Sequence, residues 1–510
     1  MKRSASLGSH LAPDRFGVAL GAGDAVERPR RLEWRMIPST YERYLTDDWH
    51  HATSTFPVTS PADGSTIGHA ADCGASEAEA AIDVSWRAFE SWRATTPFER
   101  SALLRRWQEA ILSQRDEIAE LMSTEMGKPV RESRAEVAYA AGFIEWYAEE
   151  AKRVEGSWLA SARPNRRALT MRQPIGPAYA VTPWNFPAAM ITRKAAPALA
   201  AGCTMIVKPA EQAPFTALRL AELWAEVGGP SGTLQVLPAA DPVPMTKVMM
   251  ADPRIRKVTF TGSTEVGRLL YRQSADTLKR LSLELGGHAP YIVFDDADVD
   301  RAVREVIACK FRNAGQTCVC TNRIYVQAGI HDAFTAALVE AVAKLRVGDP
   351  LSAETDIGPL IDEQGMEKVE AHVADAVARG ATVLLGGSRV DGLFFQPTVV
   401  TGVDPDMVLM HEETFGPVAP VLVFDTEEEA IERANATPYG LAAYVYTNDL
   451  ARALRVSEAL EYGIVGVNDG VPAVPHAPFG GVKQSGIGRE GGHWGIDEYL
   501  EVKYVSLGIE

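Results

Sequence analysis

Short apolar runs alternate with amphipathic helical stretches from about residue 75 to the end of this chain. The run at 177–184 (PAYAVTPW) precedes a helical stretch after Pro187, and the run at 203–210 (CTMIVKPA) precedes another at 215–227. Later runs are KVTFTGS at 257–263, PYIVF from 290, NRIYVQ from 322 and ATVLLGG from 381. Strands separated by helices predict parallel sheets with right-handed crossovers. We therefore expect an α/β fold with two parallel-sheet units in succession.

Three amphipathic helices are predicted ahead of these runs. The stretch from Ser76 (SEAEAAIDVSWRAFESWRA) begins with a capping residue and has Glu79 at its fourth place. Residues 101–122 and 131–153 repeat apolar side chains at helical spacing. At 510 residues the chain is too long for one simple core, so we expect two or three domains.

Composition excludes several classes of partner. The formal net charge of −16 repels phosphate backbones, so we expect no nucleic-acid partner. The most apolar stretch, 188–207, is interrupted by Arg193 and Lys194, so it is not a membrane span. The first residues lack the apolar core of a signal peptide, and five cysteines make no disulfide framework in so long a chain. A cytoplasmic enzyme is the expectation.

The segment FRNAGQTCVC, 311–320, is the first candidate for chemistry. Its Asn, Gly and Gln residues predict an irregular polar loop in which the thiol of Cys318 can be exposed and activated. A lone cysteine is more often an inert core residue, so further evidence is needed. Cys318 and Cys320 have no Cys or His partners at zinc spacing, so no metal is expected. GAGDAV from Gly21 lacks a third glycine and a preceding strand, which excludes a Rossmann fingerprint there.

Three other segments strengthen the case for a catalytic thiol. Glu284, in LSLELGGHAP, stands in an apolar run where a desolvated carboxylate suits a general base, although an exposed strand-edge Glu is the plainer alternative. Asn185, in VTPWNFP, could donate to an oxyanion, although Asn between prolines is usually only a turn residue. In FTGSTEVG a strand ends at Gly262 and a helix starts at Ser263, where free N–H groups can bind a pyrophosphate.

These segments, in this order, resemble the aldehyde dehydrogenase superfamily over roughly residues 41–508. KPAEQAPFTAL from Lys208, HEETFGPV from His411 and PFGGVKQSGIGRE from Pro478 agree with the same family. The resemblance implies that Cys318 attacks an aldehyde, with the Asn185 amide and the Cys318 N–H holding the oxyanion. A hydride then leaves for nicotinamide, and Glu284 activates the water that hydrolyses the thioester. Some relatives that transfer the acyl group to coenzyme A lack this Glu, so its presence here favours a free acid product.

The resemblance also implies a nicotinamide cofactor site. Glu211 would bind the adenosine ribose and repel a 2′-phosphate, which favours NAD, while the neighbouring Lys208 leaves NADP open. Ser263 would bind the pyrophosphate, and Glu413 and Phe415 the nicotinamide end. The full expected set is Thr182, Pro183, Trp184, Lys208, Glu211, Gly262, Ser263, Gly286, Glu413 and Phe415.

Two arginines suggest the substrate class. Arg312 stands six residues before Cys318, and Arg193 lies about two turns into the helix after Asn185. Either alone could be a solvated surface residue, but both beside one site on an acidic protein suggest a clamp for a carboxylate. FRNAGQTCVC and ITRK are the versions seen in succinate-semialdehyde dehydrogenases, and Phe479 completes the expected substrate contacts.

One departure from that subfamily keeps the exact substrate open. Its members usually carry Ser in the loop before PFGG, whereas this loop has Ala473 and Val474. His476 could supply the missing donor, or the pocket could be longer and more apolar. Succinate semialdehyde is therefore the leading substrate, glutarate semialdehyde a close rival, and an apolar or aromatic aldehyde a further alternative.

The expected division of the chain follows the same family. Residues 1–40 form an arm of unknown role, 41–151 and 175–286 the NAD-binding domain, and 287–485 the catalytic domain. Residues 152–174 and 486–510 form an oligomerisation arm, and covering its strand edges predicts a homodimer or homotetramer. Cys318 and Cys320 could form a redox-sensitive disulfide, although a Cys-x-Cys bridge is strained. A non-catalytic relative or a thiol esterase are the rival functions, and retention of the thiol, the Glu and the cofactor residues argues against both.

Overall fold

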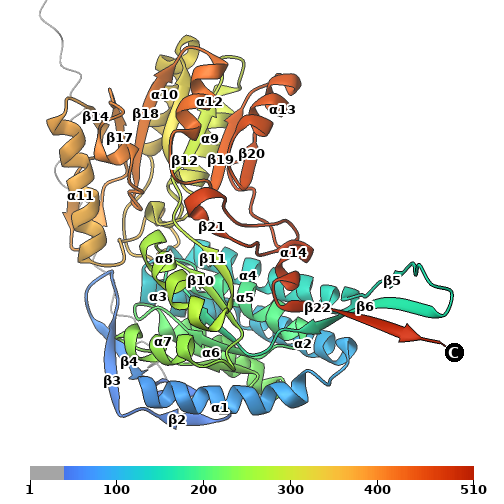
Figure 1. Cartoon of the computed structure of the whole chain (residues 1–510). Helices are drawn as coiled ribbons and strands as arrows, with labels where there is room; N and C mark the ends of the chain where they lie inside the picture. Colours follow the sequence, from blue (N-terminus) through green and yellow to red (C-terminus); the bar gives the residue numbers. More distant parts are fainter. Residues whose placement is uncertain (1–38, 510) are drawn as a thin grey trace, which may run out of the picture.

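The structure, a computed structural model, describes residues 39–509 (Figure 1), so the arm predicted for residues 1–40 lies almost entirely outside the described part. Two α/β units lie one above the other in this view, and a narrow three-stranded sheet projects from the lower one. None of the helices in residues 39–509 is long and apolar enough to cross a bilayer. The predicted α/β fold with two parallel-sheet units is confirmed.

The lower unit is built on an eight-stranded sheet in the order β2-β1-β9-β8-β7-β10-β11-β21. Its five central strands run parallel, and the outer strands β1, β2 and β21 pair antiparallel. In sheet order the bounds are Trp49–His51, Arg43–Leu45, Leu234–Val236, Met205–Lys208, Ala178–Val181, Lys257–Thr261, Arg280–Glu284 and Gly486–Ile487. The hairpin of β3 (Ser54–Thr59) and β4 (Thr66–Asp72) is separate from this sheet.

Eight helices belong to this unit, and α4 packs against α5 and α2. Helix α5 follows β7, and all of its residues are buried. Close packing on every side of this helix favours small side chains, which explains its alanine-rich sequence. The bounds of α1 to α8 are Ala75–Trp92, Pro97–Ser113, Arg115–Met126, Val130–Glu150, Pro187–Ala201, Pro214–Glu226, Pro242–Ala251 and Thr264–Gln273.

The upper unit is built on a seven-stranded sheet in the order β14-β17-β18-β13-β12-β19-β20. The bounds in that order are Thr382–Leu385, Thr398–Thr401, Val418–Phe424, Thr321–Gln327, Ala289–Val293, Ala442–Tyr446 and Ile464–Val467. Helices α9 to α13 span Val299–Lys310, His331–Val342, Glu363–Ala378, Glu427–Asn435 and Leu450–Ala459, and β15 (Arg389–Asp391) pairs with β16 (Phe394–Phe395). Its side chains form a hydrophobic core distinct from those of the lower unit.

The structure differs from the sequence predictions at three places. The helix predicted at 101–122 is two helices, because the backbone turns at Gln114, whose side-chain oxygen accepts from Arg219 of α6 at 3.1 Å. The run from residue 381 gives β14, which pairs antiparallel with β17 at the edge of the sheet rather than adding a parallel strand. Residues 486–499 do not join the projecting sheet, because β21 pairs with β11 and α14 (Gly492–Asp497) packs against α5.

The projecting sheet consists of β5 (Trp158–Leu159), β6 (Arg166–Pro174) and β22 (Leu500–Gly508). β22 pairs with β6 along nine residues, so the end of the chain is held against a segment more than 300 positions earlier. Figure 1 shows this sheet extending away from both units.

Candidate active site

Cys318 lies in a tightly folded loop between α9 and β13. Asn313 and Ala314 both have positive φ, at 51° and 54°, a conformation that costs energy for residues with a side chain. Gly315 follows with φ of 76°, and a Cβ there would lie 2.2 Å from the carbonyl oxygen of Gly416. A Cβ at Gly287 would lie 2.4 Å from the carbonyl oxygen of Cys318 itself. Close approach of neighbouring backbone therefore holds the loop in one shape.

The thiol of Cys318 is partly exposed and carries a raised pKa. Burial raises the pKa of the Cys318 thiol to about 12, against a lowering contribution from Arg193. The carboxyls of Glu413 and Glu284 also raise this pKa, while Arg312 lowers it. At neutral pH the thiol is therefore protonated, and forming the nucleophilic thiolate requires a proton acceptor.

Glu284, the last residue of β11, is the acidic group best suited to accept a proton. Its side chain is buried, and neither carboxyl oxygen has a hydrogen-bond partner among residues 39–509. Burial raises the pKa of Glu284 well above its ordinary value, and the neighbouring Glu490 raises it further. A Cβ at Gly480 would lie 2.8 Å from Oε1 of Glu284, so that loop can pass the carboxyl only with glycine. A desolvated carboxyl without partners fits a general base.

Asn185 lies between β7 and α5, beside the loop of Cys318. Its Nδ2 donates to the carbonyl oxygen of Gln316 at 3.0 Å, and its Oδ1 is buried without a partner. Its backbone oxygen accepts from Nζ of Lys128 at 2.7 Å and from Nδ2 of Asn313 at 3.2 Å. The second Nδ2 hydrogen remains free to donate to an oxyanion.

The two arginines differ in their ion pairing. Arg193 is fully buried in α5, forms an ion pair with Glu490, and lies 4.1 Å from the ring centre of Phe479. Arg312 lies 5.3 Å from the ring centre of Phe186, and its buried Nε has no hydrogen-bond partner. Among residues 39–509, Arg312 forms no ion pair within 4.0 Å. Both arginines lower the pKa of Cys318, so the structure brings them to the thiol together.

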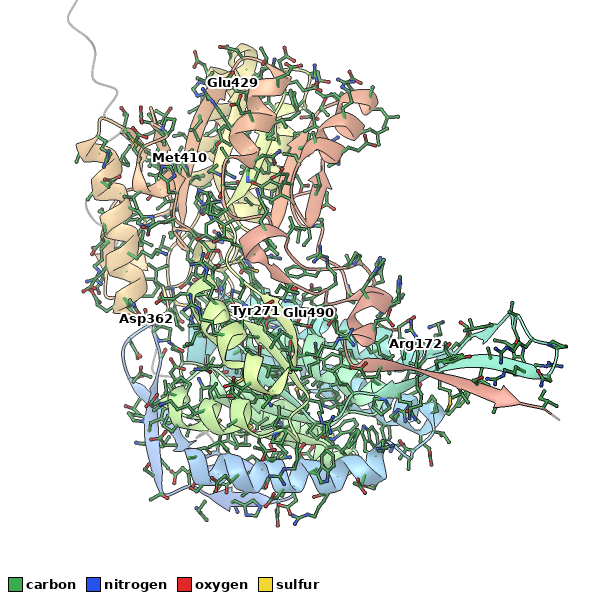
Figure 2. All side chains as sticks on the ribbon, in the orientation of Figure 1. Arg172, Tyr271, Asp362, Met410, Glu429 and Glu490 are labelled. Carbon is green, nitrogen blue, oxygen red and sulfur yellow. The ribbon has the colours of Figure 1, made fainter. Side chains whose placement is uncertain are left out.

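Glu490 and Lys194 are neighbours of the site that sequence reasoning did not single out. Glu490 accepts from Nζ of Lys194 at 2.7 Å, and the same Nζ donates to Thr261 at 2.5 Å. Figure 2 labels Glu490 where the two units meet. Both residues stand inside segments that resembled the family, ITRK and PFGGVKQSGIGRE, and that resemblance was the only available signal.

The residues expected at the pyrophosphate and the adenosine ribose lie at the carboxyl ends of the lower sheet's strands. Ser263 caps α8, its side chain accepting from the N–H of Val266 at 3.3 Å, and Gly262 precedes it. Lys208 ends β8 and pairs with Glu211 at 3.0 Å, and its carbonyl accepts from the N–H of Thr182 at 3.1 Å. Pro183 continues that loop. This is the edge of a parallel sheet at which nucleotides bind.

The residues expected at the nicotinamide end also lie together. Glu413 accepts from the N–H of Gly287 at 3.2 Å, and burial raises the pKa of Glu413 to about 7. A Cβ at Gly286 would lie 3.1 Å from Oε2 of Glu413, so glycine keeps that space open. Phe415 has a positive φ of 55° and contacts the Trp184 ring edge-on at 5.7 Å. This open cradle of glycine, carboxylate and aromatic rings fits a nicotinamide riboside.

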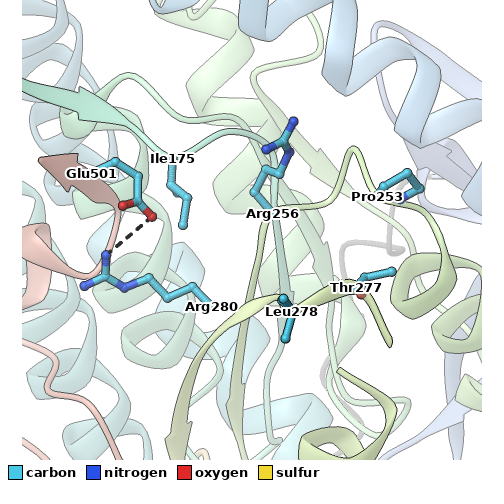
Figure 3. Close-up of a pocket in the computed structure, with 7 residues that line it drawn as sticks. All are labelled: Ile175, Pro253, Arg256, Thr277, Leu278, Arg280 and Glu501. Atoms are coloured by element: carbon cyan, nitrogen blue, oxygen red, sulfur yellow. Dashed lines mark ion pairs between the residues drawn. The ribbon is translucent and has the colours of Figure 1, made fainter. Parts of the chain in front are cut away.

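A surface hollow of about 480 Å³ lies elsewhere, between β11, β22 and the turn after α8 (Figure 3). Arg280 and Glu501 line it as a pair 3.9 Å apart. None of its lining residues belongs to the site around Cys318.

Comparison with known proteins agrees with this geometry. The model of the aldehyde dehydrogenase family matches residues 49–505. The chain is 52% identical over 472 residues to the mitochondrial succinate-semialdehyde dehydrogenase of Homo sapiens, covering 92% of this chain and 88% of that protein. It is 50% identical over 470 residues to the glutarate-semialdehyde dehydrogenase of Pseudomonas putida, covering 92% and 98%. The crystal structure of an E. coli NADP-dependent enzyme superimposes with a TM-score of 0.91 at 50% identity, covering 92% and 99%. The chain therefore belongs to the aldehyde dehydrogenase family, as its motifs indicated.

Proposed function

We propose that the chain oxidises an aldehyde with a distal carboxylate, succinate semialdehyde first, to the free acid with NAD. The observation that carries this proposal is Arg312, a cation beside Cys318 without a carboxylate partner among residues 39–509. A partly buried guanidinium without an anion lowers the stability of the folded protein. A substrate carboxylate would pair with it through two parallel hydrogen bonds. The named activities of the human and P. putida relatives, both on semialdehydes of dicarboxylic acids, support the same class.

Arg193 has a different role in this proposal. Its guanidinium already pairs with Glu490, so it is less available than Arg312 to bind a second carboxylate. Its guanidinium instead stacks on Phe479 and fixes that ring beside the site. The pair of arginines thus divides into one that binds the carboxylate and one that shapes the pocket.

The reaction follows from the positions of three side chains. Glu284 takes the thiol proton and releases it to solvent, and the sulfur of Cys318 attacks the aldehyde carbon while the Asn185 amide and the N–H of Cys318 hold the oxygen as it becomes negative. Bound NAD(P) supplies the acceptor for the hydride that leaves this carbon. Glu284 then takes a proton from water, which attacks the thioester carbon, and the sulfur of Cys318 leaves as the acid forms.

The preference for NAD rests on Glu211. Its side chain is partly exposed, paired with Lys208, and carries a negative charge where the adenosine ribose is expected. Repulsion between this carboxylate and a 2′-phosphate disfavours NADP. The family uses both cofactors, and the E. coli enzyme shares the fold while depending on NADP, so this single residue is the point to test.

The test of the substrate is a ratio of kcat/KM values for succinate semialdehyde and butanal, which differ by the carboxylate alone. We expect the acid to be favoured by at least about tenfold, or roughly 1.4 kcal/mol. Arg312→Ala should remove that preference and leave butanal oxidation nearly unchanged. Arg379→Ala, which removes an exposed arginine at the end of α11, is the matched control. Equal turnover of both aldehydes by the unaltered enzyme would refute the proposal.

Glutarate semialdehyde is the second candidate, favoured by the loop before Phe479. Ala473 is small, partly buried and packed against the upper core, where a Ser would narrow the pocket and add a donor. One further methylene in the substrate would occupy that space. A higher kcat/KM for glutarate semialdehyde than for succinate semialdehyde would make the longer acid the main substrate.

We further propose that the projecting sheet joins copies of this chain into a homodimer or homotetramer. Its strands carry exposed apolar side chains, which a partner subunit would cover: Trp158, Val502 and Tyr504 are all more than half exposed. Light scattering after gel filtration gives the mass, and Val502→Asp should lower it. The cytoplasmic location stays a prediction.

A further inference from the structure

Lys128, just before α4, and two glutamates four apart on α4 support the loops that carry Asn185 and Cys318. Lys128 precedes α4 by two residues, and Glu132 and Glu136 lie in its first two turns. Nζ of Lys128 donates to the backbone oxygen of Asn185 at 2.7 Å, and Oε2 of Glu132 accepts from the backbone N–H of Asn313 at 2.8 Å. Residues four apart on a helix share one face. The start of α4 therefore contacts both the Asn185 segment and the Cys318 loop.

Glu136 completes this face by binding the start of α5. Its Oε1 accepts from the N–H groups of Ala188 and Ala189, at 3.0 and 3.2 Å, and its other oxygen pairs with Lys128. Both members of the pair are fully buried. The negative carboxylate caps N–H groups that have no partner within the helix. The position of α5, which begins two residues after Asn185, is thus fixed by the same ion pair.

Lys128 contacts the backbone of Asn185 and not its side-chain amide. Its Nζ lies 3.7 Å from the ring centre of Phe186, so the carbonyl of Asn185 and the side chain of the next residue are both held by one ammonium group. The carbonyl also accepts from Asn313, while Nδ2 of Asn185 reaches Gln316. These contacts hold the backbone carbonyl of Asn185 and one hydrogen of its side-chain amide. The other amide hydrogen can then donate in one direction only.

We propose that Lys128 is a positioning residue for the oxyanion site: its buried pair with Glu136 fixes the backbone at Asn185 so that the remaining amide hydrogen meets the aldehyde oxygen. The inference rests on the oxyanion role of Asn185 in the proposed function. A buried ion pair is weak evidence for stability, since an apolar pair of equal volume is often as stable. Only a charged donor of this length holds a carbonyl, a carboxylate and an aromatic ring together.

The test is a double-mutant cycle on Lys128 and Asn185, measured as kcat and KM for succinate semialdehyde. Asn185→Ala should lower kcat by about 10²–10³, as loss of an oxyanion donor does. Lys128→Met should lower kcat by about 10–100-fold with KM within about threefold, because only the transition state gains from the amide. In the Asn185→Ala background, Lys128→Met should cost less than about threefold more, and Lys128→Arg should restore most of the activity.

Alkylation of Cys318 by iodoacetamide distinguishes a misplaced Asn185 amide from general damage to the fold around Cys318. This reaction displaces iodide and forms no oxyanion, so its rate should be unchanged in Lys128→Met. Lys279→Met is the matched control, because Lys279 is also buried and also donates to backbone carbonyls, yet lies away from the site. If Lys128→Met does not fold, Lys128→Met with Glu136→Gln, which leaves no lone buried charge, takes its place in the cycle.

Two results would overturn the proposal in distinguishable ways. Losses that multiply in the double variant would show that Lys128 acts on catalysis without Asn185, and the oxyanion role would stand. Full activity of Asn185→Ala would remove the oxyanion role and the positioning role together. A loss in Lys128→Met that appears in KM alone, or equally in the alkylation rate, would also contradict it.

Discussion

Removal of Glu490 should destabilise the folded protein near the site, because within residues 39–509 its carboxylate is the ion-pair partner of two buried cations. Its carboxylate pairs with Arg193 and accepts from Lys194 at 2.7 Å, and all three side chains are buried. Removing one partner of a buried pair costs about 3–5 kcal/mol. Glu490→Gln keeps the shape and removes the charge, so we expect a loss in this range. At about 2 °C per kcal/mol for a unit of roughly 250 residues, the melting temperature should fall by about 6–10 °C.

The pH dependence of that loss tests its electrostatic origin. Burial already lowers the pKa of Lys194, and Glu490 opposes this shift, so the variant should have a Lys194 pKa lower still. A lysine with a folded pKa below its unfolded value binds fewer protons when folded, and stability then rises with pH between the two values. The deficit of Glu490→Gln should therefore be smaller at pH 9 than at pH 7.

Thermal melting of the variant and the unaltered protein, at matched protein concentration, measures both effects. Glu461→Gln removes an exposed carboxylate that pairs with Lys483, and serves as control with an expected change within about 1 °C. A Glu490→Gln protein that melts like the control, or whose deficit does not shrink with pH, would refute the assignment of Glu490 as the counter-ion of both cations.

Other predictions concern the chemistry. Glu284→Gln should lower steady-state turnover by at least about 10² and slow the first burst of NADH as well, because thiol deprotonation and thioester hydrolysis both need this base; a burst at the rate of the unaltered enzyme would contradict the first of these two roles. Without substrate, alkylation of Cys318 by iodoacetamide should keep accelerating with pH to pH 9 and beyond, since burial raises the pKa of the thiol to about 12; a plateau below pH 9 would contradict this. Glu211→Gln should raise kcat/KM for NADP by about tenfold relative to NAD, and an unchanged ratio would show that another residue selects the cofactor.

The order of strands and helices was readable from the sequence because buried parallel strands and amphipathic helices leave clear periodic patterns. The strand ending at Lys208, the helix after Pro187 and the strand ending at Thr261 all lie within two residues of the predicted positions. The break at Gln114 was not readable, because it involves neither Gly nor Pro and coincides with a contact to Arg219. The antiparallel pairing of β14 was equally hidden, since strand direction depends on long-range connection.

At the site, residue identities could be predicted but their pairing could not. Motifs indicated Cys318, Glu284 and Asn185, because each carries a recognisable chemical group in an unusual local sequence. Nothing in sequence separates Arg193 from Arg312, since the distinction arises from Glu490, which lies 297 positions after Arg193 and pairs with it in space. The same holds for Lys128 and its contact with the carbonyl of Asn185.

An acidic protein can select an acidic substrate because salt screens the repulsion from its distant surface charges more strongly than it screens the attraction from a charge inside the site. The net charge of −16 is spread over the whole chain, and at physiological ionic strength its field decays over about 8 Å. Inside the site the nearest charges decide, and there Arg193 is offset by Glu490 whereas Arg312 has no partner among residues 39–509. The substrate carboxylate therefore meets, in Arg312, a positive charge that has no ion-pair partner among these residues. Raising the salt concentration should weaken the overall repulsion more than this contact, so KM for the acid aldehyde should not rise with moderate salt, whereas an attraction carried by exposed surface charges would make it rise.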